Sequence, residues 1–201
     1  MLRHTLDHMP HILVVCTGNV CRSPLIERYL QREMDAAYGP GTVEVRSAGT
    51  GALADHAMDE RSAAILTDLG GDPSGFLGRR LTPAMLRDTP LVITATRDHR
   101  AAVVKMHPKA LRTAFTLREL AHLGAQMGTS ALPADPAERL AAVAREGVAL
   151  RGTHARLAPE DLDVVDPYRR SDETYALMRE QLEPALAQVA SVLAPPRGDG
   201  S

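Results

Sequence analysis

Both cysteines of the 201-residue chain lie in one short stretch, VVCTGNVCRSPL at residues 14–25. Cys16 ends a β-branched run, Cys21 follows five residues later, and Arg22 comes directly after it. A loop between a strand and a helix start presents backbone N–H groups and partial positive charge, which bind anions and favour a thiolate over a thiol. A guanidinium such as that of Arg22 holds two phosphoryl oxygens at once. The stretch therefore predicts a nucleophilic sulfur, that of Cys16, beside a bound phosphoryl group.

Three small residues of the stretch fit this chemistry. Gly18 allows close approach of the backbone, and Asn19 tolerates the left-handed conformation that a tight anion-binding loop needs. Ser23 is expected to cap the following helix and to donate its hydroxyl to the Cys16 sulfur. A C-x5-R pattern alone occurs by chance, and a lone Cys at a strand end is more commonly a small buried side chain. The β-branched run before it and the helix started by Pro24 after it favour the functional interpretation.

Strand-like and helix-like segments alternate along the rest of the chain. We expect strands at 11–16, 42–49, 90–96 and 111–117, and helices at 25–39, 58–71, 97–108 and 172–194, the last one interrupted or kinked near Pro184. This alternation is typical of βαβ units, so an α/β fold with a parallel sheet covered on both faces is predicted. The cysteine loop then lies at the carboxyl end of the sheet, where such folds bind ligands.

The domain prediction is a single domain over residues 1–195. A section at about 118–160 is long for a connection and contains two helix-like segments around a turn-rich break, so we expect a helical insertion or flap there. Residues 196–201 are predicted to be a disordered tail.

Composition and charge narrow the class of protein. The net charge of −2 gives no reason to expect nucleic acid as a partner, and the longest apolar runs are too short to span a membrane. We read no secretion signal, so a cytoplasmic location is expected, with export by another route left open. Two cysteines make no disulfide framework and the eight histidines are scattered, so no metal site and no cofactor are expected. The sequence predicts no oligomeric state.

Four segments resemble the low-molecular-weight protein tyrosine phosphatases of bacterial type. CTGNVCRSP resembles the phosphate loop of that family, RSAGTGALA at 46–54 its second strand and substrate-wall loop, DERSAAILTDLGGD its second helix, and DPYRRSDETY at 166–175 its acid loop. The resemblance covers roughly residues 11–194. It implies a three-layer α/β sandwich with a four-stranded parallel sheet in the flavodoxin-like order 2-1-3-4 and helices on both faces.

The resemblance also implies a mechanism that needs no metal. Cys16 would attack phosphorus and form a cysteinyl-phosphate intermediate, Arg22 would hold the phosphoryl oxygens, and Asp166 would protonate the departing phenolate and then activate water. Asn19 and Ser47 would keep the loop in shape. The residues implied to surround the phosphate and the substrate ring are Thr17, Gly18, Asn19, Val20, Cys21, Ser23, Ser47, Leu53 and Tyr168. The implied partner is a phosphotyrosine-containing protein or peptide.

Tyr168 and Leu53 would form the two walls of the slot for the substrate ring, so the slot is expected to be apolar but only half aromatic. Phe76 stands where the family usually has a histidine that supports the loop, which predicts that part of this polar support is missing or replaced. Cys21 has two readings: a buried filler behind the loop, or a partner that traps oxidised Cys16 as a disulfide, which the family pattern favours.

Three alternatives accompany the tyrosine phosphatase interpretation. Thioredoxin-linked arsenate reductases share the loop and fold but need further cysteines, which this chain lacks. Protein arginine phosphatases carry a threonine before the second loop cysteine, where this chain has Val20. An inactive phosphopeptide-binding module typically loses the nucleophile, the arginine or the acid, and all three are present here.

Overall fold

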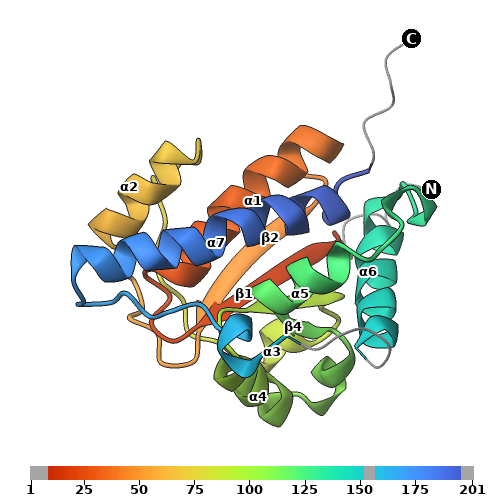
Figure 1. Ribbon diagram of the computed structural model, residues 1–201. Coiled ribbons are helices and arrows are strands. Elements are labelled where there is room, and N and C mark those ends of the chain that lie inside the picture. Colours follow the sequence, from red (N-terminus) through yellow and green to blue (C-terminus); the bar gives the residue numbers. More distant parts are fainter. Residues whose placement is uncertain (1–8, 152–156, 196–201) are drawn as a thin grey trace, which may run out of the picture.

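Four parallel strands form the centre of the computed structural model, which describes residues 9–151 and 157–195 (Figure 1). The strands are β1 (His11–Cys16), β2 (Glu44–Gly49), β3 (Leu91–Thr94) and β4 (Ala114–Thr116), in the spatial order β2-β1-β3-β4. The predicted order 2-1-3-4 is confirmed. Cys16 pairs with Gly49 of β2, and Val15 pairs with Thr94 of β3, so the segments that follow these three strands start side by side.

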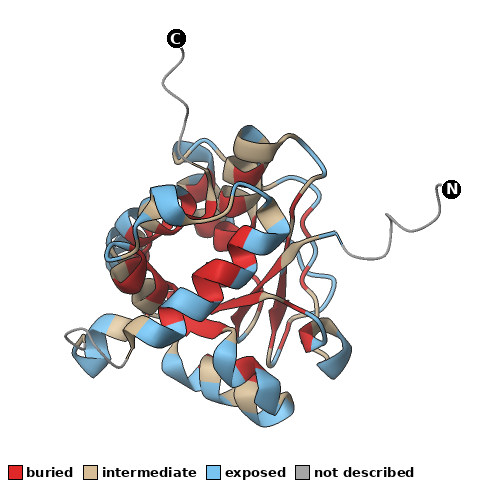
Figure 2. Ribbon diagram, turned by 90° about the vertical axis from the view of Figure 1, so that its right-hand side faces the viewer, coloured by how far each residue is buried: buried red, intermediate tan, exposed pale blue. Residues whose placement is uncertain are grey.

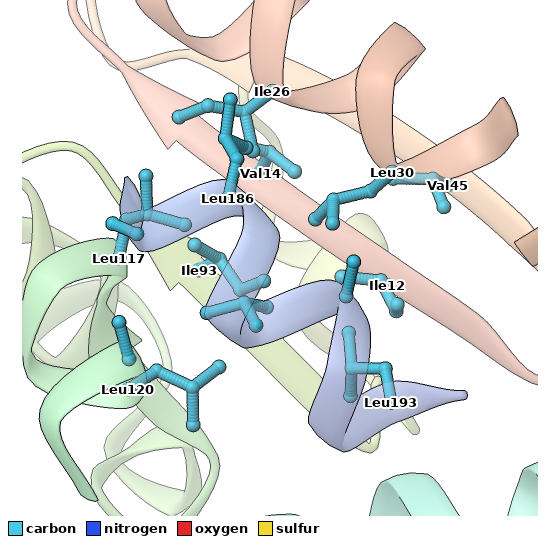
Figure 3. Close-up of a cluster of buried hydrophobic side chains, with 14 of the residues drawn as sticks. Ile12, Val14, Ile26, Leu30, Val45, Ile93, Leu117, Leu120, Leu186 and Leu193 are labelled. Atoms are coloured by element: carbon cyan, nitrogen blue, oxygen red, sulfur yellow. The ribbon is translucent and has the colours of Figure 1, made fainter. Parts of the chain in front are cut away.

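Successive residues of β1 face opposite layers of helices, because side chains alternate along a strand. Ile12 and Val14 belong to the larger buried cluster, together with α1 (Arg22–Tyr38), α5 (Leu117–Gly124) and α7 (Asp172–Leu193). Figure 3 shows side chains from the sheet and from these helices meeting there. Leu13 and Val15 face a smaller cluster with α3 (Pro83–Leu86) and α4 (Arg97–Met106). The result is the predicted three-layer arrangement, in which the strands are almost entirely buried (Figure 2).

Several element bounds differ from the sequence prediction. The strand expected at 111–117 begins only at Ala114, because Pro108–Arg112 form a 3-10 helix. Helix α2 (Glu60–Asp68) starts one residue after Asp59, whose carboxylate accepts hydrogen bonds from two amides of the first turn, and it ends before the Gly70–Gly71 pair. Pro184 lies inside α7, which continues through it as one helix, so of the expected interruption or kink the interruption is wrong. Helix α3 was not expected.

The section at 118–160 contributes to the main core. Leu120 of α5, and Leu140 and Val143 of α6 (Pro136–Leu150), are buried in the larger cluster. Helix α6 stands at the right of Figure 1, near the end of the sheet where β1 begins, whereas the loop after β1 lies at the left. Helix α6 is therefore remote from that loop. Residues 152–156, and the tail predicted at 196–201, lie outside the described residues.

Across residues 9–151 and 157–195, no helix is both long and apolar enough to cross a membrane.

Candidate active site

A pocket opens where β1 ends, and several residues singled out from the sequence line it. Segments from three parts of the chain contribute, and the lining residues are Cys16, Thr17, Gly18, Val20, Cys21, Arg22, Gly51, Leu53, Asp166 and Tyr168. The fold thus brings Cys16 and Arg22 together with Asp166 and with both expected walls, Leu53 and Tyr168. Asn19, Ser23 and Ser47 are not among the lining residues. All three are buried.

The loop after Cys16 turns its carbonyl groups away from the pocket. Four of these oxygens accept hydrogen bonds of 2.8–3.0 Å from amides of the segment at 50–59, in the pairs Cys16 with Thr50, Thr17 with Gly51, Gly18 with Leu53, and Val20 with Asp59. In a trans peptide the N–H points opposite to the C=O, so the amides of residues 17, 18, 19 and 21 point the other way. Within the described chain none of these amides donates to a protein acceptor. Such converging N–H groups form an anion-binding nest.

Asn19 holds the turn of this loop from the inside. Its φ of 54° is the left-handed conformation expected from the sequence. Its amide nitrogen donates to the hydroxyls of Ser23, at 2.9 Å, and Ser47, at 2.7 Å, while its oxygen accepts from the Arg79 amide at 2.7 Å. Both amide hydrogens of this buried side chain are therefore donated, and its oxygen accepts one hydrogen bond.

Ser23 does not cap α1, contrary to the sequence expectation. The helix begins one residue earlier, at Arg22, and Cys21 precedes it without a side-chain capping bond. The Ser23 hydroxyl lies instead 2.9 Å from the Cys16 sulfur. Because this oxygen already accepts a hydrogen bond from the Asn19 amide, its own hydrogen is available to the sulfur.

Glu27 and Arg79 support the loop through Ser47 and Asn19. Phe76 is buried in the larger apolar cluster and supplies no polar group to the loop. The Arg79 guanidinium donates to the Glu27 carboxylate at 2.8 Å, and the Ser47 hydroxyl donates to the same oxygen. Burial raises the pKa of Glu27, while the Ser47 hydrogen bond and the Arg79 charge oppose that rise. Sequence analysis missed this pair; its signal was a glutamate among the apolar positions of α1, four residues after Ser23.

Arg22 joins the loop to the segment that carries Asp166. One of its terminal nitrogens lies 2.6 Å from the Asp166 carboxylate and the other donates to the Val164 carbonyl at 3.1 Å. Its Nε is buried and has no partner among the described residues. Asp166 also accepts a hydrogen bond from the Tyr168 amide at 3.2 Å, which fixes the turn between them.

His99 reaches the loop from α4 and was not singled out from the sequence. Its Nε2 lies 2.8 Å from the hydroxyl of Thr17, a lining residue of the pocket. Burial and the nearby Arg22 charge lower the pKa of His99 to about 4. No residue pattern in the sequence connects two positions that are 82 residues apart.

Cys21 is buried to the same degree as Cys16. Burial, followed by the negative charge of Asp59, raises the pKa of Cys21 to about 11. Its sulfur lies 3.8 Å from the Tyr175 hydroxyl. Cys21 is therefore a protonated thiol at neutral pH. Among the described residues no cluster of three or more His, Cys, Asp or Glu side chains is arranged to hold a metal ion.

The chain is similar to proteins of one family in sequence and in structure. The family model described as "Low molecular weight phosphotyrosine protein phosphatase" matches residues 11–132. Over 98 residues the chain is 40% identical to the low molecular weight protein-tyrosine-phosphatase Etp of Escherichia coli K12, a match that covers 49% of this chain and 62% of Etp. The chain thus spans less than two thirds of the length of this curated relative.

Two solved structures have the same fold. The tyrosine phosphatase Wzb from Escherichia coli K30, solved in complex with phosphate, superposes with a TM-score of 0.62 at 26% identity and covers 92% of this chain and 93% of that one. The YwlE arginine phosphatase from Geobacillus stearothermophilus superposes with a TM-score of 0.62 at 23% identity, over 90% of each chain. The second likeness concerns the fold alone.

Proposed function

The chain belongs to the low molecular weight phosphotyrosine protein phosphatase family, and from that premise we propose that it hydrolyses phosphotyrosine in proteins or peptides. The observation that carries the proposal is the loop geometry. Four backbone amides face a pocket that also holds a nucleophilic side chain, Cys16, a guanidinium, Arg22, and a carboxyl group, Asp166. These are the parts that a phosphate monoester needs for displacement at phosphorus.

The first chemical step transfers the phosphoryl group to sulfur. The Cys16 thiolate forms the S–P bond while the bond between phosphorus and the tyrosine oxygen breaks. The loop amides and Arg22 stabilise the charge on the three transferring oxygens. Asp166 gives its proton to the departing phenolate oxygen, so the leaving group departs as a neutral phenol.

The second step returns the enzyme to its starting state. Asp166, now a carboxylate, takes a proton from water as that water attacks phosphorus. The S–P bond breaks, which releases inorganic phosphate and restores the Cys16 thiolate, and the Ser23 hydroxyl stabilises that thiolate.

The ion pair between Arg22 and Asp166 suggests how substrate binding sets up the acid. The Asp166 side chain is half exposed, whereas Arg22 is almost fully buried, so the carboxylate is the partner that is free to move. A phosphoryl group that enters the nest competes with this carboxylate for the guanidinium. Its arrival frees the Asp166 carboxylate, which takes up a proton from solvent or from the phosphate monoanion and then acts as the acid toward the leaving oxygen.

The lining of the pocket favours a phenyl ring next to the phosphate. Tyr168 supplies an aromatic wall and Leu53 an aliphatic one. Val20, which is buried, offers no hydroxyl to a guanidinium-bearing substrate. These three side chains support phosphotyrosine over phosphoarginine as the substrate. The two free cysteines fit a reducing compartment, so we place the protein in the cytoplasm.

A kinetic comparison tests the proposal. Wild type, Cys16→Ser and Asp166→Ala are assayed on matched phosphotyrosine, phosphoarginine and phosphoserine peptides. We expect phosphotyrosine to be the best substrate and Cys16→Ser to show no detectable turnover. For Asp166→Ala we expect kcat to fall by at least about 100-fold. Comparable wild-type rates on phosphoserine contradict the assignment of the slot. A higher rate on phosphoarginine assigns the alternative substrate, and full activity of Cys16→Ser refutes the mechanism.

A further inference from the structure

His99 lies in the first turn of α4 with both ring nitrogens engaged. Its side chain is only 7% exposed. Nε2 lies 2.8 Å from the Thr17 hydroxyl, and Nδ1 lies 2.8 Å from the hydroxyl of Thr96, the residue that caps this helix. The ring is therefore clamped between the helix cap and the loop that carries Cys16.

Thr17 is the loop residue next to the nucleophile. Its carbonyl accepts the Gly51 amide at 3.0 Å, and its own amide is one of the four that face the pocket. Thr17 is exposed, whereas Cys16 just before it and Asn19 two residues after it are buried. Among the described residues, the hydrogen-bond partner of the Thr17 hydroxyl is the His99 ring.

The ring is uncharged at neutral pH, because burial and the Arg22 guanidinium outweigh the attraction of Asp166, Asp98 and Asp163 and keep the pKa of His99 near 4. A neutral imidazole has one N–H and one acceptor nitrogen. Both neutral tautomers are compatible with the two hydroxyl partners, since a hydroxyl both donates and accepts. The clamp therefore holds without placing a second positive charge against Arg22.

We propose, on the basis of the phosphatase function above, that His99 is a positioning residue whose hydrogen bond to Thr17 holds the amides next to Cys16 in line with the bound phosphoryl group. His99 touches neither the substrate nor the sulfur. It acts through Thr17, whose backbone is anchored on one side by Gly51 and whose side chain is anchored on the other by the ring. Loss of the second anchor lets the first loop peptide rotate away from the oxygens it must contact.

Two substitutions at position 99 separate positioning from folding. The amide nitrogen of a glutamine lies near the place of Nε2, so His99→Gln keeps a donor for Thr17. The shorter His99→Asn keeps only a partner for Thr96. For His99→Asn we expect kcat/KM on a phosphotyrosine peptide to fall about tenfold, and the Ki of inorganic phosphate to rise by a similar factor, as for one lost hydrogen bond. His99→Gln is expected to recover most of both.

A double-mutant cycle with Thr17→Val completes the test. If the two side chains act through one bond, the double variant Thr17→Val/His99→Asn loses no more kcat/KM than Thr17→Val alone. The proposal would be overturned if the factors by which the two substitutions lower kcat/KM multiplied in the double variant. A His99→Gln variant as impaired as His99→Asn would overturn it too. So would unchanged kcat/KM and phosphate Ki in His99→Asn.

The two proposals fail in different ways. An inactive wild type on every phosphopeptide refutes the phosphatase function itself. An active wild type with normal His99→Asn kinetics refutes only the role of His99. Thermal unfolding of each variant shows whether a kinetic loss is accompanied by loss of the fold; a loss of kcat/KM confined to variants that unfold at lower temperature also counts against positioning.

Discussion

The Ser23 hydroxyl contacts the sulfur of Cys16, and neighbouring side chains direct the hydrogens of this hydroxyl and of Ser47. Asn19 donates to Ser23, which leaves the Ser23 hydrogen for the sulfur. The same amide donates to Ser47, whose hydrogen goes to Glu27. At the scale of single residues, the two amide hydrogens of Asn19 therefore orient both hydroxyls, and the Ser23 hydrogen is left for the sulfur.

The buried neutral His99 makes stability depend on pH. Its pKa is about 4 in the folded protein and near 6.5 in an unfolded chain. Between these values the unfolded state binds a proton that the folded state does not, so stability is complete above about pH 6.5 and is lost as the pH falls toward 4. The loss is on the order of 3 kcal/mol.

Urea unfolding of wild type and His99→Gln at pH 7, 5.5 and 4.5 measures this effect, because the variant lacks the titrating group while all other groups titrate alike. We expect the stability of wild type relative to the variant to decline as the pH is lowered. A difference between the two proteins that stays constant with pH would show that His99 titrates equally in both states.

Two neighbouring parallel strands build the site at the scale of elements. β1 delivers Cys16 and β2 delivers Gly49 at the same height in the sheet, and the segment after β2 binds the carbonyls of the loop after β1. The loop is thus shaped by a second loop, and the amides that face the pocket are a consequence of this pairing.

Gly49 is where the two segments approach most closely. A Cβ atom at this position would lie 2.3 Å from the Thr17 carbonyl oxygen and 3.0 Å from the Ala52 Cα, both of which are backbone atoms. We therefore expect Gly49→Ala to displace the loop, to lower kcat/KM on a phosphotyrosine peptide by at least about tenfold, and to cost about 2 kcal/mol of unfolding free energy.

Gly128→Ala is the matched control, since a Cβ there meets no atom within 4 Å and the φ of −72° suits alanine. Its rates and unfolding free energy should equal those of wild type. Wild-type kinetics in Gly49→Ala would mean that the loop does not depend on this close approach.

Helix α7 connects the site to the core of the whole molecule. It begins six residues after Asp166, and it packs along its length against α1 and α5 in the larger buried cluster. The Val165 amide, next to the acid, also donates to Gln181 of this helix at 2.8 Å. The position of the acid segment is therefore set by how α7 packs against the sheet.

Leu182 of α7 is fully buried and Leu177, on the same helix, is 44% exposed. We expect Leu182→Ala to lower the unfolding free energy by about 2–5 kcal/mol through lost burial and the cavity it leaves. Leu177→Ala should change it by less than about 0.5 kcal/mol. Chemical denaturation of both variants measures the difference, and equal losses would contradict the packing described for α7.

The sequence alone determined the local chemistry and the order of the elements. The spacing from Cys16 to Arg22, the β-branched run before it and the helix-forming run after it are contiguous, so their geometry follows from short-range rules. The alternation of strands and helices predicted the parallel sheet for the same reason. The resemblance added Asp166, Leu53 and Tyr168, which the fold brings to the same pocket.

Only the tertiary structure decided how the loop is supported. His99 and Thr17 are 82 residues apart, and Arg79 and Glu27 are 52 apart, so no local pattern predicts that they meet. Of the two roles expected for Ser23, the contact with the Cys16 sulfur is present and the helix cap is not, because the helix begins at Arg22. The replacement of the family histidine by Phe76 was visible in the sequence; the charged pair that takes over its support became visible only when α1 was packed against the segment at 76–80.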